Sequence, residues 1–337
     1  MRNSLDTLIG INQFLRGDTM KRFKNILLFA DPNTDVAVSS KWALTLAKQN
    51  HARLTVVDVV GQLPRDLQSS LTTLPLTLEE LQDIVVKERL NQLEKLVKKA
   101  HKKGIRVSTK VLIGTPFLEI IRDVLHNHYD LVIKSAENKS TASKLLFGST
   151  DLNLMRKCPC PVWVIKSSKR KLNARILAAV DPDPSNPEAK ELNALIMDLA
   201  ISLATQERSE LHIVHAWKMY VKETYLSLHD SLRPQNVAKM VREEKNLHKG
   251  RLDKLLSNYD LEAINHHVHL LKGDADQVIS QLANKKRVEL LVMGTVVRTG
   301  IPGFLIGNTA ERVLNQVNCS VLTVKPKGFV TPVERDE

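Results

Sequence analysis

The sequence predicts an α/β protein of two tandem open-sheet domains, each a mostly parallel five-stranded sheet with helices on both faces. Its 337 residues are about twice the size of a common single domain. Short apolar runs alternate with helical periods along the chain, which is the pattern of consecutive βαβ units. The same series of runs occurs twice, so an internal repeat defines the two domains.

The repeat begins with an apolar run that ends in Asp-Pro, NILLFADP at 25–32 and ARILAAVDP at 174–182. Later landmarks share an offset of 159 residues, as in Gly114 and Gly273 (273 − 114 = 159). The other landmarks with this offset are Asp130 and Glu289, Gly148 and Gly307, and Lys166 and Lys325. We therefore expect domains at 22–168 and 175–327, a linker at 169–174, a flexible extension at 1–21 and a tail at 328–337.

Each half is expected to read β-α-β-α-β-α-β-α-β. The strands of the first half are predicted at 25–30, 53–60, 106–113, 130–134 and 162–166, and those of the second at 175–180, 210–216, 266–272, 289–293 and 321–325.

Helix starts support these assignments. Thr77 and Glu80 have the spacing of a capping box, and Pro116 follows Thr115 at a first helical position. In the second half Asn186-Pro187 and Asp274-x-x-Gln277 are expected to start helices in the same way.

Composition excludes some classes of protein and leaves others open. No apolar run approaches the roughly 18 residues of a membrane helix, so no membrane span is expected. Residues 1–19 lack a signal-peptide pattern, and three cysteines cannot form a disulfide framework, so we expect a cytoplasmic protein. A net charge of +12 favours acidic partners. Aromatic residues make up only 4%, which makes nucleic acid an unlikely partner, although weak nucleic-acid binding remains an alternative.

The stretch from Gly294 to Thr309 is the first candidate for a ligand site. In an open parallel sheet the ligand crevice lies beyond the carboxyl ends of the strands, where Asp181 and Gly294 are both expected. Gly307 opens the last helix, and its free N–H groups would attract an anion. Alternatively, Asn308 and Glu311 cap this helix themselves and the stretch is an ordinary helix start.

The repeat and this stretch resemble the universal stress protein family in its tandem two-domain bacterial form, over residues 22 to 327. The resemblance is carried by the Asp after each first strand, and by LHIVHAW, LLKGDADQVI, ELLVMGTV and GNTAERVLNQVNCSVLTVKP in the second half. It implies a role in stress response.

The resemblance also implies a nucleotide site with the pattern G-x2-G-x9-G-[ST]. In the second half Gly294 and Gly307 match, whereas Val297 and Asn308 depart from the pattern. In the first half Ser135 and Asn138 replace the first two glycines, and Gly148-Ser149 match. The adenosine-side positions correspond to Asp181 and Ala216 in the second half, and to Asp31 and Val59 in the first.

We therefore expect a degenerate site for ATP or another nucleotide-bearing metabolite, mainly in the second half. Its candidate residues are Asp181, Ala216, Gly294, Thr295, Arg298, Gly307, Asn308 and Thr309. A weaker first-half site would use Asp31, Val59, Gly148 and Ser149. Arg298 could reach a phosphate that a missing glycine amide no longer binds, or it is a solvated surface arginine.

Catalysis and metal binding are not expected. No nucleophile has a recognisable elbow or a partnered histidine spacing. The histidines of HIVH at 212–215 and HHVH at 266–269 lie on strands, where successive side chains face opposite sides.

A protein-interaction or regulatory role without ATP is the alternative class. The resemblance implies pairing through the last strands, so a tandem chain would form an intramolecular pseudo-dimer. The leucine-rich segment 61–81 is either a docked helix or a lid over an acyl-bearing or other apolar ligand.

Overall fold

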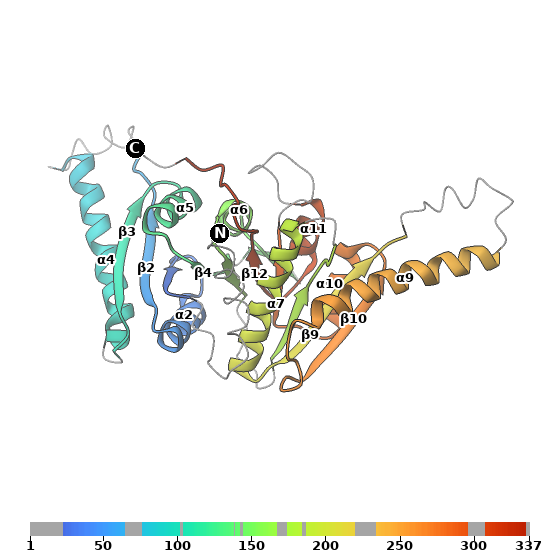
Figure 1. The fold of residues 1–337 in the computed structure, drawn as a ribbon. Coiled ribbons are helices and arrows are strands. Elements are labelled where there is room, and N and C mark those ends of the chain that lie inside the picture. The colour runs from blue at the N-terminus through green and yellow to red at the C-terminus, as the bar shows by residue number, and fades with distance from the viewer. Residues whose placement is uncertain are drawn as a thin grey trace, which may run out of the picture.

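The computed structural model describes residues 23–64, 76–101, 104–137, 139–141, 144–166, 174–183, 187–219, 234–295 and 307–334. Ten strands form one sheet in the order β10-β9-β8-β11-β12-β7-β4-β1-β2-β3 (Figure 1). The predicted fold class is confirmed, since five strands from each half are parallel to one another.

The elements of the first half follow the expected order. They are β1 (Asn25–Phe29), α2 (Val36–Asn50), β2 (Arg53–Val60), α4 (Leu78–His101), β3 (Val107–Ile113), α5 (Pro116–Asn127), β4 (Leu131–Ser135), β5 (Lys139–Thr141), β6 (Lys144–Leu146), α6 (Ser149–Lys157) and β7 (Val162–Ile165). The short β5–β6 hairpin was not predicted, because strands of three residues are too short to show a readable periodicity.

The second half repeats this order without the hairpin in its described residues. Its elements are β8 (Arg175–Ala179), α7 (Pro187–Glu207), β9 (Glu210–Trp217), α9 (Pro234–Leu256), β10 (His266–Lys272), α10 (Ala275–Lys285), β11 (Leu290–Gly294), α11 (Asn308–Gln316) and β12 (Ser320–Val324). The repeat extends to backbone torsions, because Gly114 and Gly273 have φ of +143° and +142°.

Two helix starts were predicted correctly in detail. The Thr77 hydroxyl accepts from the amide of Glu80 at 3.1 Å, and the Glu80 carboxylate accepts from the amide of Thr77 at 2.8 Å. Pro116 is the first residue of α5.

Asp274 is the N-cap of α10, but its side chain makes no capping bond and instead pairs with Lys218. The expected reciprocal bond with Gln277 is therefore absent. Asn186 lies outside the described residues.

The two halves are joined through their last strands, as expected for an intramolecular pseudo-dimer. β7 and β12 are antiparallel, with Val321 beside Val164 and Thr323 beside Val162. Each face of the sheet also carries one apolar core that includes residues of both halves. The pairing of the last strands therefore continues into the packing on both faces.

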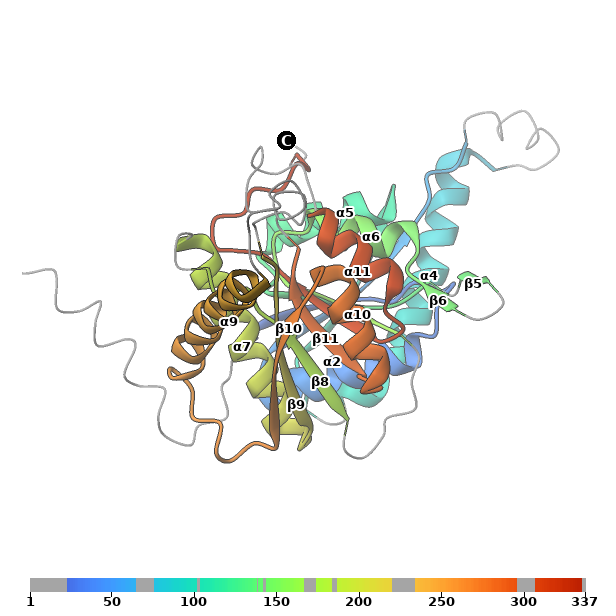
Figure 2. The ribbon, with the colours of Figure 1, turned by 90° about the vertical axis from the view of Figure 1, so that its right-hand side faces the viewer.

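Helices cover both faces of the sheet (Figure 2). α2, α4, α7 and α9 contribute to one core, for example through Leu46 and Ile196. α5, α6, α10 and α11 contribute to the other, for example through Ile120 and Val313. Among the described residues, no helix is both long enough and apolar enough to cross a membrane.

The strand order places one crevice in each half. β1 lies between β4 and β2, and β8 lies between β11 and β9. In each half the second strand lies on one side of the first strand and the fourth strand lies on its other side. This reversal of strand order forms a crevice at the carboxyl ends of these strands. The neighbouring positions of the first and fourth strands, which the candidate site requires, are confirmed by the pairs Phe29–Lys134 and Ala179–Met293.

Candidate functional site

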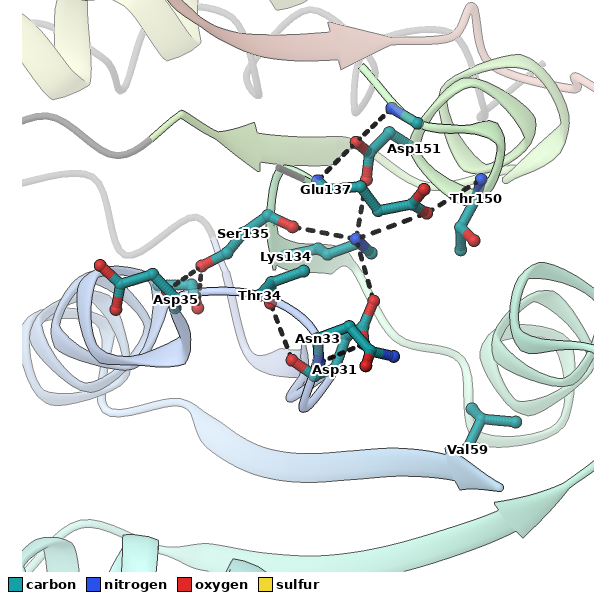
Figure 3. A network of polar contacts seen from close by, with 12 residues as sticks. Asp31, Asn33, Thr34, Asp35, Val59, Lys134, Ser135, Glu137, Thr150 and Asp151 are labelled. Carbon is teal, nitrogen blue, oxygen red and sulfur yellow. Dashed lines mark hydrogen bonds and ion pairs between the residues drawn. The ribbon is translucent and has the colours of Figure 1, made fainter. Parts of the chain in front are cut away.

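The first-half crevice is filled by a buried lysine at the end of β4 (Figure 3). The Lys134 side chain has no exposed surface, and its Nζ lies 2.8 Å from Asp151 Oδ1 and 3.5 Å from Asp31 Oδ2. Nζ also donates to the Ser135 carbonyl at 2.9 Å and lies 4.0 Å from Glu137 Oε1. A single ammonium group therefore joins the loop after β1, the end of β4 and the start of α6.

The start of α6 is occupied by two carboxylates of the chain itself. Asp151 accepts from the amides of Gly148 at 2.9 Å and Glu137 at 3.0 Å, and Glu137 accepts from the amide of Thr150 at 3.2 Å. A helix N-terminus attracts an anion, and here the anion is the Glu137 side chain. A Cβ on Gly148 would lie only 1.7 Å from Glu137 Oε2, so the glycine admits this carboxylate.

The charges of this network do not balance. One ammonium group faces three carboxylates, those of Asp31, Glu137 and Asp151. Burial raises the pKa of Asp151, while the nearby Lys134 opposes that shift. An excess of negative charge at the crevice disfavours a nucleotide phosphate there.

Asp31 and Val59, the predicted adenosine-side residues of the first half, have different surroundings. Asp31 is buried and pairs with Lys134, and its Oδ1 also accepts from the amide of Asn33 at 2.9 Å. Val59 lies on β2 outside this network, as Figure 3 shows. Ser149 is the first residue of α6, next to Gly148.

The second-half crevice lacks the residues that close the first. Strand register puts Met293 at the position of Lys134, and Ala310 is the third residue of α11 as Asp151 is the third of α6. Met293 and Ala310 are both buried. The described part of this crevice therefore has neither the ammonium group nor the Asp151 carboxylate.

The structure brings most of the predicted second-half residues to one edge of the sheet. Asp181 follows β8, Ala216 lies near the end of β9, and Gly294 ends β11. The Asp181 side chain is 49% exposed, and its Oδ1 lies 3.9 Å from His215 Nδ1. Its backbone is held by Asn193, whose amide group makes two 2.8 Å bonds with the N–H and C=O of Asp181. The carboxylate is thus accessible on a fixed backbone.

The start of α11 adjoins this edge. The Gly307 amide donates to the Thr295 carbonyl at 3.0 Å, which holds the helix start against the end of β11. Asn308 and Thr309 are exposed. Arg298 lies outside the described residues, as does most of the leucine-rich segment.

One prediction for this stretch needs correction. Asn308 is the first helical residue of α11 and Gly307 is the N-cap, with no side-chain capping bond, so Asn308 and Glu311 are not a capping pair. Glu311 instead pairs with Arg156 on α6 of the other half. Gly294 also has a packing role, because a Cβ there would lie 2.6 Å from Leu192 Cδ2.

Thr295 is at the contact between the halves. Its side chain is buried, and its hydroxyl donates to the Met155 carbonyl at 3.3 Å and accepts from Lys325. Lys325 also donates to the Met155 carbonyl, and Lys166 donates to the Val317 carbonyl at 2.7 Å. Burial lowers the pKa of Lys325 to about 7 and that of Lys166 to about 8. The Thr295 hydroxyl thus serves this contact rather than a ligand.

The histidines form two groups on opposite faces of the second half. His212 Nδ1 lies 2.9 Å from His269 Nε2, and His215 Nε2 lies 2.8 Å from His248 Nδ1. Burial lowers the pKa of both His212 and His215 to about 4. Within the described ranges no three His, Cys, Asp or Glu side chains converge as metal ligands would.

Sequence reasoning missed Lys134, Glu137, Asp151 and His248. The available signal for Lys134 was a lysine at the end of an apolar strand, and for Asp151 an acidic residue in the first turn of a helix. Neither signal identifies the partners.

The fold and both crevices define a class of protein. The family model for the universal stress protein family matches residues 22–166 and 173–325, so the chain belongs to this family and is a tandem member of it.

Particular relatives have the same tandem length. Universal stress protein E of Escherichia coli (strain K12) is 29% identical over 331 residues, covering 94% of this chain and 99% of that protein. The Universal stress protein E homolog of Haemophilus influenzae is 25% identical, covering 90% and 98%.

A solved structure of a putative universal stress protein from Pseudomonas aeruginosa has a TM-score of 0.65 at 24% identity, covering 93% of this chain and 96% of that chain. A universal stress protein from Archaeoglobus fulgidus gives 0.61 at 18% identity, covering 92% and 98%. At these identities the structures support the fold.

Proposed function

We propose that this tandem stress protein is a non-catalytic, cytoplasmic ligand-binding regulator whose second half holds ATP or another nucleotide-bearing metabolite. The ligand would lie at the carboxyl ends of β8, β9 and β11. Asp181 and Ala216 would face its nucleoside, and the backbone around Gly294 and at Gly307, Asn308 and Thr309 would face its phosphates.

The difference between the two crevices carries this proposal. In the first half Lys134, Glu137 and Asp151 occupy the space and the anion position at α6. In the second half Met293 and Ala310 stand at the positions of Lys134 and Asp151. The half with the exposed aspartate is therefore the one without these two charges.

The start of α11 supports the phosphate side. Among the described residues no side chain hydrogen-bonds the amides at the start of α11, whereas Asp151 and Glu137 bind the amides of Gly148 and Thr150 at the start of α6. Exposed helix amides favour a negatively charged ligand.

Isothermal titration of the full chain with ATP, ADP and a UDP-sugar tests the proposal. We expect one site per chain, with Asp181→Ala weakening binding roughly tenfold through loss of charge-assisted hydrogen bonds. The matched control is Asp31→Asn, which changes the equivalent residue of the closed half and should leave the affinity unchanged.

The same samples test the non-catalytic role, because the bound nucleotide should be recovered unhydrolysed after incubation. Absence of heat with all three ligands at millimolar concentration, or sensitivity to Asp31→Asn alone, would contradict the proposed site.

A further inference from the structure

A second cavity lies in the first half at the end of the sheet opposite the crevice. It has a volume of about 370 Å³ and opens at the amino ends of β1, β2 and β3. Its polar lining includes Asn25, Arg53, Thr55, Arg106, Ser108 and Tyr129. This volume is at the lower end of the range for small-molecule sites.

The lining is basic and rich in hydroxyl groups. Within the described residues neither Arg53 nor Arg106 has a carboxylate at ion-pair distance, although Arg106 Nη2 is held by the His51 carbonyl at 2.6 Å. The hydroxyls of Thr55 and Ser108 meet across two strands at 3.3 Å. Burial raises the pKa of Tyr129 to about 12, so its hydroxyl stays protonated.

The nearest carboxylates bind groups other than the two guanidinium groups. Asp130 accepts from the backbone amides of Lys24 at 2.7 Å and Asn25 at 3.1 Å. Asp123 binds Lys110 at 2.5 Å and Asn127 at 2.8 Å. The two guanidinium groups therefore keep their charge available for a ligand.

The second half fills the same place with its own side chains. Strand register aligns Thr55 and Ser108 with His212 and His267, which stack with ring centroids 5.1 Å apart. It also aligns Arg53 with Glu210, which binds His267 at 2.8 Å and Arg175 at 2.9 Å. A stack of imidazole rings next to the Glu210 carboxylate thus stands where the first half has the basic, hydroxyl-lined cavity.

We propose that this cavity of the first half binds a small phosphorylated metabolite of about the size of a monosaccharide phosphate. Arg53 and Arg106 bind the phosphate, since guanidinium groups match its geometry. Thr55, Ser108 and Tyr129 bind the hydroxyl groups of the ligand. The site is separate from the proposed nucleotide crevice, because it lies at the other end of the strands and in the other half.

Titration of the full chain with glucose 6-phosphate, followed by calorimetry and by the amide resonances of residues 53–55 and 106–108, tests this site. Glucose is the neutral control and should bind at least tenfold more weakly. We expect Arg53→Glu, which installs the second-half residue, and Arg106→Asn to weaken binding by roughly tenfold to a hundredfold. As a control, Lys87→Gln removes the positive charge of an exposed lysine on α4 and should leave the affinity unchanged.

The double variant Thr55→His with Ser108→His fills the cavity with the residues that the second half already accommodates, and it should abolish binding. Absence of binding at millimolar glucose 6-phosphate, equal binding of glucose, or unchanged affinity in Arg53→Glu and Arg106→Asn would each overturn the proposal. Loss of binding in Asp181→Ala would place the ligand in the second half. Since that variant tests the nucleotide crevice, the two proposals can fail independently.

Discussion

The two halves of the chain have the same strand order and register but carry clustered polar side chains at opposite ends of their sheets. At the carboxyl ends, the first half holds the Lys134 network, whereas the second half has Met293 and Ala310. At the amino ends, the first half has a cavity and the second has stacked histidines. A repeated backbone thus retains its apolar core while a few polar positions differ at its two ends.

The largest expected effect comes from breaking the first-half network. Lys134→Met installs the second-half residue but leaves three buried or partly buried carboxylates without their cation. We expect a loss of about 3–5 kcal/mol in the free energy of unfolding, measured by urea denaturation.

The matched control combines Lys134→Met with Glu137→Val and Asp151→Ala, the residues that stand 159 positions later in the second half. Because whole buried ion networks can often be replaced without loss, this triple variant should be more stable than Lys134→Met alone. If Lys134→Met alone is no more destabilising than the triple variant, the ion network does not contribute to stability in the way proposed. If calorimetry shows a second ATP site in the triple variant, these three residues account for the difference between the two crevices.

The next effect concerns acid sensitivity. The first half pairs Asp58 with Arg89 where the second half has His215 and His248. Burial lowers the pKa of His215 to about 4, below its unfolded value of about 6.5, so stability present above pH 6.5 is lost as pH falls toward 4. Burial raises the pKa of Asp58. Protonation of this carboxyl as pH falls therefore stabilises the folded state, which is the opposite of the effect of His215.

The double variant His215→Asp with His248→Arg installs the first-half pair. Between pH 6.5 and 4 its free energy of unfolding should fall by about 2–3 kcal/mol less than that of the unchanged protein. Chemical denaturation at several pH values measures the change. The single variant His248→Asn is the control, because it leaves His215 buried and acid-sensitive. An unchanged pH profile in the double variant would exclude His215 as the source.

The smallest effect is expected at the contact between the halves. Arg156 and Glu311 pair across it, with side chains 30% and 39% exposed. Glu311→Gln should lower the free energy of unfolding by at most about 1 kcal/mol, and the loss should be smaller at high salt. Thermal denaturation at low and high salt measures both. Glu334→Gln, which removes an exposed carboxylate from the C-terminal segment, is the control for net charge. A salt-independent loss well above this value would mean that the pair does more than link two surfaces.

Local pattern was sufficient for much of the fold. The apolar runs of β1 and β8 lead into Asp-Pro, which marked both strands in the sequence, whereas their pairing with β4 and β11 is a finding of the structure. Thr77 and Glu80 cap α4 because the two residues are three apart on one chain, so their bond depends on local geometry alone.

The candidate sites were predictable only in part. The sequence by itself determined the repeat, the strands and the edge of the sheet that carries Asp181 and Gly294, because periodicity and turn residues act over short distances. Only the tertiary structure decided that Lys134 meets Asp31, that His215 meets His248 and that Glu311 meets Arg156 rather than Asn308. Those contacts join residues 33 to 155 positions apart, and a buried charge or imidazole takes whichever partner the packed helices and strands bring within reach.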